Sequence, residues 1–130
     1  SLHDALPIFA QSGEPAEAPR DQFGRLTFTF DMANAIFHLL TTHAEYGTYN
    51  MTGSGKVASW YDIAKIVYKT AGADTAALRA NSVEEYVQST HGALRPRNCS
   101  LDLSKLESTG YTPVDWEEAL RDYLQKEIAK

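Results

Sequence analysis

The sequence is poor in three features that would each point to a class of protein: cysteine, clustered basic residues and long apolar runs. Cys99 is its only cysteine, so no internal disulfide can form, which fits a reducing compartment such as the cytoplasm. The formal net charge is -5 and no basic cluster of the kind that tracks phosphates is present, so nucleic acid is not an expected partner. Apolar runs fall far short of the roughly 20 residues that cross a bilayer, so no membrane association is expected.

What the sequence does contain is typical of one soluble domain. The chain has 130 residues, of which 43% are hydrophobic and 22% are charged. These proportions are ordinary for a globular protein, and the length allows a real core.

Residues 1–8, SLHDALPI, differ in character from the rest. Their apolar stretch is too short for a signal peptide and no basic segment precedes it. They are one translation of TCC CTA CAC GAC GCT CTT CCG ATC, which resembles a common sequencing adaptor, so we interpret them as a library artefact; an authentic N-terminus is the alternative. Residues 9–20 are rich in Pro and Glu without periodicity and predict a loop. The domain is therefore expected over residues 21–130.

Apolar periodicity predicts about five helices. Three of them are expected to begin at the capping residues Asp31, Ser59 and Asp115, and two shorter ones over residues 82–88 and 102–108. The helix after Asp31 has an apolar face made of Met32, Ile36, Leu39 and Leu40. The last helix has an apolar stripe made of Trp116, Ala119, Leu120, Tyr123 and Leu124.

Two or three short strands complete the prediction, the clearest over residues 26–29 and 46–52. This is too little strand for a doubly wound sheet of the chain's own. The expected fold class is therefore helix-rich α/β.

The stretch GSGKVA, residues 53–58, satisfies the spacing of a dinucleotide-binding loop. Such a loop needs the helix to begin at the glycines, so that its amides face the pyrophosphate. Here the expected cap, Ser59, comes after the motif, and no acidic residue ends a second strand about 20 residues further on. We interpret the stretch as a glycine-rich turn between a strand and a helix.

Tyr61 and Lys65 have the Y-x-x-x-K spacing of short-chain dehydrogenases. In those enzymes the ammonium group lowers the pKa of the phenol, but any helix with Tyr and Lys four residues apart matches by chance. No strand with a catalytic Ser or Thr precedes this pair at a suitable distance. We expect Tyr61 to flank the apolar face and Lys65 to be solvated.

The histidines and the cysteine predict no metal site or nucleophile. His38 and His43 are five residues apart, which places them on different helical faces, and His91 is distant. Cys99 has no histidine close in sequence and is expected to be a small buried residue.

Arginines in two loops are the remaining candidates for a binding site. Arg95 and Arg97 flank a proline that fixes φ, and a stiff loop with guanidinium groups suits bidentate phosphate binding. A surface loop with solvated arginines is the alternative. Arg25 lies in the second loop, residues 21–25.

Five blocks of the sequence form a longer pattern: QFGRLTFTFDMA at residues 22–33, GTYNMTGSG at 47–55, SWYDIA at 59–64, RPRNCSLD at 95–102 with Lys105 and Leu106, and WEEAL at 116–120. The same blocks occur in this order in the dTDP-4-dehydrorhamnose reductases, so the chain resembles that family from about residue 22 to residue 124. Each block is weak alone, but five in register are specific.

The resemblance implies an extended short-chain dehydrogenase, in which an N-terminal Rossmann domain binds NADPH or NADH and a smaller C-terminal lobe holds the nucleotide sugar. The chain would be that C-terminal lobe, with the Rossmann half missing. The implied reaction is the reduction of dTDP-4-dehydro-L-rhamnose to dTDP-L-rhamnose in the cytoplasm. The family's cofactor loop and its Tyr/Lys pair lie upstream of this chain. We therefore expect it to hold no catalytic or cofactor-binding residue, to bind no cofactor and to be inactive alone.

The resemblance also implies partners and site residues. The expected partners are the dTDP-sugar and the chain's own Rossmann domain, and a homodimer of the full-length protein stays open. Arg95 is the first candidate for the diphosphate and Arg97 the second, while Gln22 and Arg25 lie in the loop that enters the lobe near the cleft. Cys99 departs from the serine common in the family. A carboxylate metal site of some members is not carried over, because Glu127 is not in register with it.

Two other functions stay open. One is another nucleotide-sugar epimerase or dehydratase of the same superfamily, against which the block at residues 95–106 argues. The other is a non-catalytic regulatory subunit that shares the fold.

Overall fold

The computed structural model describes residues 10–12 and 15–128. The interpretation of residues 1–8 as library sequence therefore lies outside the described residues.

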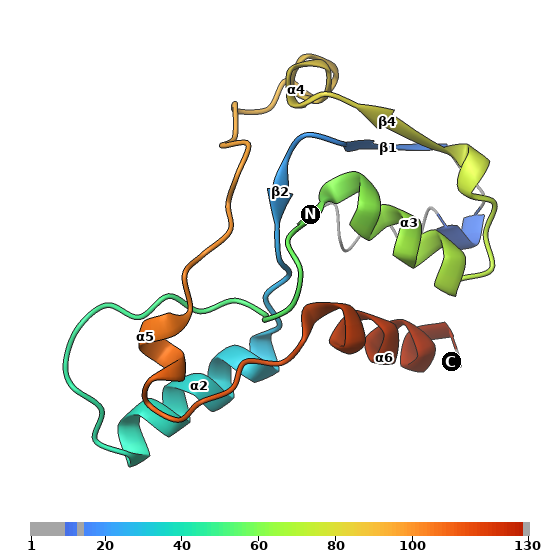
Figure 1. Cartoon of the computed structure of the whole chain (residues 1–130). Helices are drawn as coiled ribbons and strands as arrows, with labels where there is room; N and C mark the ends of the chain where they lie inside the picture. Colours follow the sequence, from blue (N-terminus) through green and yellow to red (C-terminus); the bar gives the residue numbers. More distant parts are fainter. Residues whose placement is uncertain (1–9, 13–14, 129–130) are drawn as a thin grey trace.

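The strands form two small sheets (Figure 1). In the first, β1 (Ala16–Pro19) pairs in parallel with β4 (Leu78–Asn81). In the second, β2 (Phe23–Gly24) pairs antiparallel with β3 (Ala58–Ser59). Both pairings join segments that are far apart in the sequence.

Helices account for most of the regular structure, which confirms the helix-rich α/β class. After a helical turn at residues 10–12 they are α2 (Thr29–Thr41), α3 (Trp60–Thr70), the 3-10 turn η1 (Thr75–Ala77), α4 (Val83–Thr90), α5 (Ser104–Glu107) and α6 (Trp116–Ile128). The five predicted helices are all present. Ser59 caps α3 as predicted, its hydroxyl accepting the amide of Asp62 at 3.1 Å.

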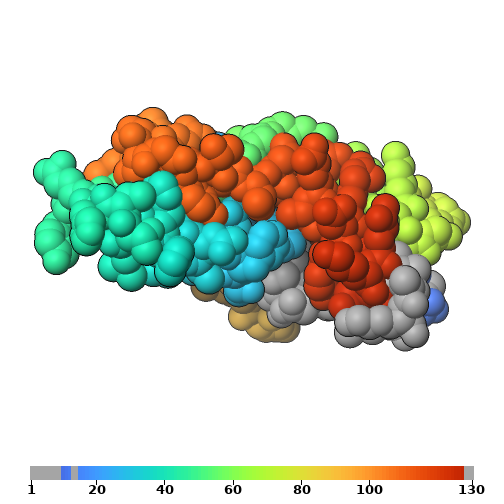
Figure 2. Space-filling view, turned by 90° about the horizontal axis from the view of Figure 1, so that it is seen from below, coloured from blue at the N-terminus to red at the C-terminus, as the bar shows by residue number. Residues whose placement is uncertain are grey.

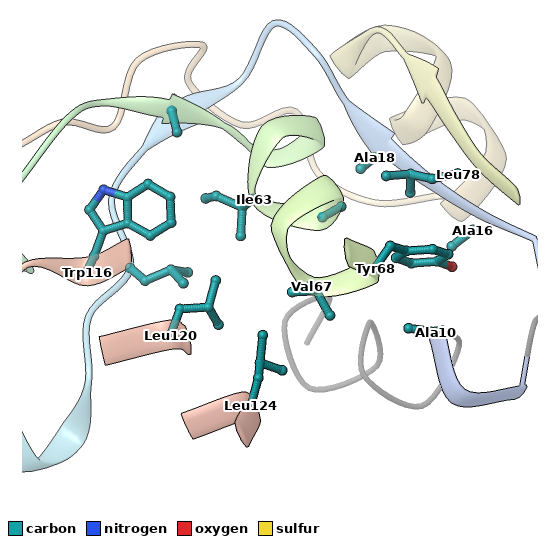
Figure 3. Packing of buried hydrophobic residues seen from close by; sticks show 13 residues of the cluster. Ala10, Ala16, Ala18, Ile63, Val67, Tyr68, Leu78, Trp116, Leu120 and Leu124 are labelled. Carbon is teal, nitrogen blue, oxygen red and sulfur yellow. The ribbon is translucent and has the colours of Figure 1, made fainter. Parts of the chain in front are cut away.

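The core lies where α3 packs between the β1–β4 sheet and α6 (Figure 3). Ile63 and Val67 of α3 meet the apolar stripe of α6, whose Trp116, Leu120 and Leu124 are buried. The indole N–H of Trp116 donates to the carbonyl of Lys56 at 2.7 Å, so its polar end is satisfied inside the core. Full burial of side chains of this size contributes about 1.5–3 kcal/mol each.

At the end of the molecule that holds α2 and α5, buried polar contacts take the place of the apolar core (Figure 1). Asp31 of α2 is buried, and its carboxylate accepts hydrogen bonds from the Tyr111 hydroxyl and from the Val114 amide. His38 contacts the carbonyl of Thr109 at 3.0 Å. These polar contacts fix one side of α2 against residues 109–114.

Three local predictions for residues 16–31 were wrong. Residues 16–19, expected within a loop, form β1. The strand was missed because its partner β4 lies about 60 residues away, and no local pattern reveals such a pairing. Residues 26–29 form no strand, since α2 already begins at Thr29. Asp31 is not the cap of this helix but a buried residue of its first turn, and Phe28 occupies the N-cap position.

Residues 46–52, predicted as a strand, do not form one. Their side chains are strand-prone, but a strand needs a neighbour to pair with, and the described residues supply none.

Candidate functional site

Two of the four predicted site residues, Gln22 and Arg95, line one small pocket. The pocket has a volume of about 190 Å³, and its wall is made by Gln22, Val83, Tyr86, Val87, Thr90, Gly92, Ala93 and Arg95. The structure thus brings together one residue from the loop after β1 and one from the loop after α4.

The chain positions Gln22 through its backbone. The carbonyl of Gln22 accepts the amide of Trp60 at 3.1 Å, which fixes the loop against the start of α3. The Gln22 residue is only 8% exposed. Its side-chain amide makes no hydrogen bond within the described part of the chain and so stays available to a ligand in the pocket.

Helix α4 forms the apolar wall of the pocket and is tightly capped at its start. The Ser82 hydroxyl accepts the amide of Glu85 at 3.1 Å, and the Glu85 carboxylate accepts the amide of Ser82 at 2.7 Å, which is a capping box. The helix ends at Thr90 and is followed by His91, whose φ of 53° is left-handed, and the chain then turns into residues 92–98.

The loop of residues 92–98 is anchored to β2. The amide of Phe23 donates to the carbonyl of Arg97 at 2.7 Å, and the amide of Cys99 donates to the carbonyl of Phe23 at 2.8 Å. Pro96 stiffens the segment between these bonds and Arg95. This anchoring holds Arg95 at the pocket beside Gln22.

Arg95 and Arg97 have different surroundings although they are two residues apart. Arg95 is exposed and makes no ion pair or hydrogen bond within the described residues. The guanidinium of Arg97 is occupied, because it pairs with Asp21 and, at 2.7 Å, with Glu84 of α4. Of these two arginines, only Arg95 has a guanidinium that is available to bind an anion.

The Arg97 pairs set the electrostatics beside the pocket. Burial opposes ionisation of Asp21, but the Val83 amide and the Arg97 guanidinium outweigh it and hold the pKa of that carboxyl below its ordinary value. The hydrogen bond to Asp21 raises the pKa of Arg97. The single guanidinium of Arg97 thus offsets one of the two negative charges of Asp21 and Glu84.

Arg25 lies apart from this pocket. It lines a second and larger one of about 420 Å³, together with Phe28, Trp60, Leu120 and Tyr123 among others. Its guanidinium makes two long contacts of 3.4 Å, to the carbonyls of Gly53 and Leu101, and its Nε is buried without a partner. The structure therefore does not bring Arg25 together with Gln22 and Arg95.

The glycines of residues 53–58 do not form a cofactor cradle. Helix α3 begins after the motif, at Trp60. A Cβ on Gly53 would lie 2.8 Å from Trp116 Cβ, and one on Gly55 (φ 97°) would lie 2.4 Å from the Asp115 carboxylate. These glycines allow close approach to the start of α6, and the Asp115 carboxylate beside Gly55 would repel a diphosphate, so this turn does not fit a dinucleotide.

Tyr61 is partly buried against the core, and Lys65 beside it is half-exposed. The Lys65 ammonium pairs with Asp62 at 2.7 Å, and that hydrogen bond raises the pKa of Lys65. The ammonium lies over the Tyr61 ring, 4.8 Å from its centroid, where it makes a cation–π contact.

Cys99 was expected to be buried and is instead exposed. Its Sγ contacts the carbonyl of Pro96 at 3.5 Å, so it lies on the outside of the anchored loop. Within residues 10–12 and 15–128, no group of three His, Cys, Asp or Glu side chains could hold a metal ion, and no helix is long and apolar enough to span a membrane.

The described residues form an α/β domain with a small pocket that is lined by Gln22 and by the unpaired guanidinium of Arg95. Residues 6–128 match the family model described as RmlD substrate binding domain, and the chain belongs to that family. The resemblance to dTDP-4-dehydrorhamnose reductases is confirmed.

Among its relatives is the spore coat polysaccharide biosynthesis protein SpsK of Bacillus subtilis, 35% identical over 90% of this chain and 39% of that protein. A dTDP-4-dehydrorhamnose reductase from Clostridium acetobutylicum has the same fold, with a TM-score of 0.79 and 25% identity over 95% of this chain and 42% of that one. The Bacillus anthracis reductase, in complex with NADP, gives 0.77 and 25% over the same shares. The chain spans about two fifths of the length of these relatives.

Proposed function

We propose that the chain is the substrate-binding part of an NAD(P)H-dependent reductase that converts dTDP-4-dehydro-L-rhamnose to dTDP-L-rhamnose in the cytoplasm. The observation that carries the proposal is the unpaired Arg95 on an anchored loop, at a pocket it shares with Gln22. A guanidinium in this position suits the diphosphate of a nucleotide sugar, because its planar fork can donate two parallel hydrogen bonds to phosphate oxygens.

Gln22 and Arg97 have supporting roles in this proposal. The free amide of Gln22 can donate to, or accept from, the part of the ligand next to the diphosphate. Arg97 holds the loop through its ion pairs with Asp21 and Glu84 and offsets one of their two negative charges. Arg25 is assigned no contact with the same phosphate, because it lines the other pocket.

The cofactor, NADPH or NADH, is proposed to bind in the part of the full-length protein outside this chain. The glycine turn at residues 53–58 does not fit it, and the Tyr61–Lys65 pair is engaged with Asp62. The isolated chain is therefore proposed to bind no cofactor and to be inactive.

The experiment is to incubate the full-length protein, and separately the isolated chain, with NADPH and dTDP-4-dehydro-L-rhamnose and to follow NADPH oxidation. The full-length protein should oxidise NADPH and form dTDP-L-rhamnose, and the chain should do neither. A full-length protein that binds the dTDP-sugar without turnover would favour the non-catalytic regulatory subunit. One that epimerises or dehydrates a nucleotide sugar would favour the other branch of the superfamily.

A further inference from the structure

The Gln22 side chain is almost completely enclosed, yet its amide group has no partner. The residue is 8% exposed, and its amide makes no hydrogen bond within the described residues. Unlike the Nε of Arg25, its polar atoms are not sealed inside the protein, so they open into the pocket that Gln22 shares with Arg95, here called the Gln22 pocket. An enclosed polar group without a partner calls for a ligand or a water molecule that satisfies it.

The Gln22 pocket has room for one small ring. Its volume of about 190 Å³ is that of about six water molecules at about 30 Å³ each. A single six-membered ring with its substituents fits this space, whereas a whole nucleotide sugar does not. The rest of such a ligand therefore has to lie outside the pocket, on the side where the guanidinium of Arg95 is exposed.

The lining of the pocket suits a flat ring with one polar edge. Val83, Tyr86 and Val87 of α4 supply an apolar wall with one aromatic ring. The Thr90 hydroxyl is already engaged, since it donates to the carbonyl of Tyr86 at 2.7 Å. A hexose carries hydroxyl groups around its whole ring and would leave most of them unpaired against this wall, which is unfavourable. A nucleobase has apolar faces and carries its hydrogen-bonding groups on its edge.

The Gln22 amide matches the edge of a pyrimidine base. It holds an N–H donor and a carbonyl acceptor side by side, and no other side chain of the lining does so. The edge of thymine or uracil presents a ring N–H between two carbonyl oxygens. An amide can form two parallel hydrogen bonds with such an edge, as glutamine does with the edge of adenine in DNA.

We propose that the Gln22 pocket binds the pyrimidine base of the nucleotide sugar and that Gln22 is a specificity-determining residue, which recognises the edge of the base. The apolar wall from α4 covers the faces of the base, and the diphosphate lies outside at Arg95. This inference rests on the proposed function and adds the recognition of the base to it.

The pocket can be changed without disturbing the rest of the fold. Helix α4 lies at the end of the molecule away from α2 and α5 (Figure 1). In Figure 2, which is seen from below, α2 in cyan and α6 in red make up much of the near face, and α4 lies on the far side. The Gln22 backbone bonds to Trp60, but its side chain bonds to nothing, so a substitution of similar size leaves that contact in place.

The experiment is calorimetric titration of the full-length protein with dTDP and with N3-methyl-dTDP, in which a methyl group replaces the ring N–H. Wild type should bind N3-methyl-dTDP at least about tenfold more weakly, because the paired hydrogen bonds at the edge of the base are lost. In Gln22→Leu the affinity for dTDP should fall about tenfold, and the two ligands should then bind within about threefold of each other. Arg95→Ala should weaken both ligands and leave their ratio unchanged.

Two further variants complete the test. Gln22→Met, unbranched and similar in length, replaces Gln22→Leu if that variant does not fold. Gln88→Leu is the matched control, since Gln88 is exposed on the same helix and does not line the pocket, and it should keep both affinities.

The ratio between the two ligands decides the outcome. Equal weakening of both in Gln22→Leu would mean that Gln22 only positions the loop, and it would overturn the proposal. Equal affinity of wild type for both ligands would also overturn it. If the ratio in wild type is as expected but Arg95→Ala has no effect, the base site stands and the diphosphate contact falls.

Discussion

The Tyr111 hydroxyl donates a hydrogen bond to the carboxylate of Asp31, 80 residues earlier in the chain, inside the first turn of α2. Burial, followed by the adjacent Asp31 carboxylate, raises the pKa of Tyr111 to about 12. The bond is one of the contacts that tie α2 to the segment before α6.

Tyr111→Phe should lower the free energy of unfolding by about 1–3 kcal/mol, because it leaves one oxygen of a buried carboxylate unpaired. Tyr46→Phe is the matched control, since Tyr46 is fully exposed and the same change should have almost no effect. Urea denaturation of the two variants checks this. If both variants were as stable as wild type, the Tyr111–Asp31 hydrogen bond would make no net contribution to the free energy of unfolding.

The same residue predicts a pH dependence. A pKa raised in the folded state means that the folded protein holds the phenol proton more tightly, so the stability from Tyr111 is present below about pH 10 and is lost between pH 10 and 12. Wild-type stability should therefore fall more steeply than that of Tyr111→Phe over this window. Denaturation curves across the range measure the difference, and parallel profiles would contradict the assignment.

Gly55→Ala should destabilise the protein more than Gly110→Ala. Both glycines have a strongly positive φ, 97° and 91°, but a Cβ on Gly55 would displace the Asp115 carboxylate, whereas one on Gly110 would meet nothing within 4 Å. Asp115 accepts the amides of Glu117 and Glu118 at the start of α6, so the excess should be about 0.5–2 kcal/mol, the range for a lost helix cap. Thermal unfolding of both variants gives the comparison. An equal loss would show that Asp115 moves aside without cost.

Tyr61→Phe and Lys65→Ala in the full-length protein should each leave kcat within about tenfold of wild type, because loss of a true transition-state contact costs more. The structural reason is that Lys65 is paired with Asp62 and stacked on Tyr61. Steady-state kinetics with NADPH checks this. A collapse of kcat in a folded variant would give the pair a catalytic role.

Arg97→Ala should change the stability of the protein more than its affinity for the ligand, because the Arg97 side chain is paired with Asp21 and Glu84. Loss of the pairs with Asp21 and Glu84 should lower the free energy of unfolding only slightly, since Arg97 is largely exposed and its pairs are screened by solvent. The lowered pKa of Asp21 also predicts a pH dependence. The stability that ionised Asp21 contributes is present above the ordinary pKa of an aspartate and is lost as the pH falls through the lower pKa of the folded state. The stabilities of wild type and variant should therefore converge in acid. Denaturation at neutral and acid pH tests both statements.

The sequence predicted those features that local patterns determine. The cap of α3 at Ser59 and the apolar stripe of α6 depend on residues within one or two turns of each other. The pairing of β1 with β4 was missed because parallel strands find each other across a long connection. Asp31 was mistaken for a cap because its partners, Tyr111 and Val114, lie some 80 residues away.

The candidate site was predicted in part for the same reason. The proline-stiffened arginines were visible in the sequence, but which of them is free depends on Asp21 and Glu84, and no spacing rule places those carboxylates beside Arg97. The apolar wall from α4 was not predicted, because the sequence indicated only a short helix over residues 82–88 and not what that helix faces. The place of this helix after a capped start at Ser82, just before the arginine loop, was the available signal.

Calorimetric titration of the full-length protein with dTDP and with the dTDP-sugar tests the central claim most directly. Arg95→Ala should weaken both by about ten- to a hundredfold, which corresponds to a charge-assisted bond of about 1.5–3 kcal/mol, and Arg95→Lys should recover only part of the affinity because it loses the planar fork. NADPH affinity should be unchanged in both variants. Unchanged dTDP affinity in Arg95→Ala would contradict the account, and the pocket beside Gln22 would then not be the diphosphate site.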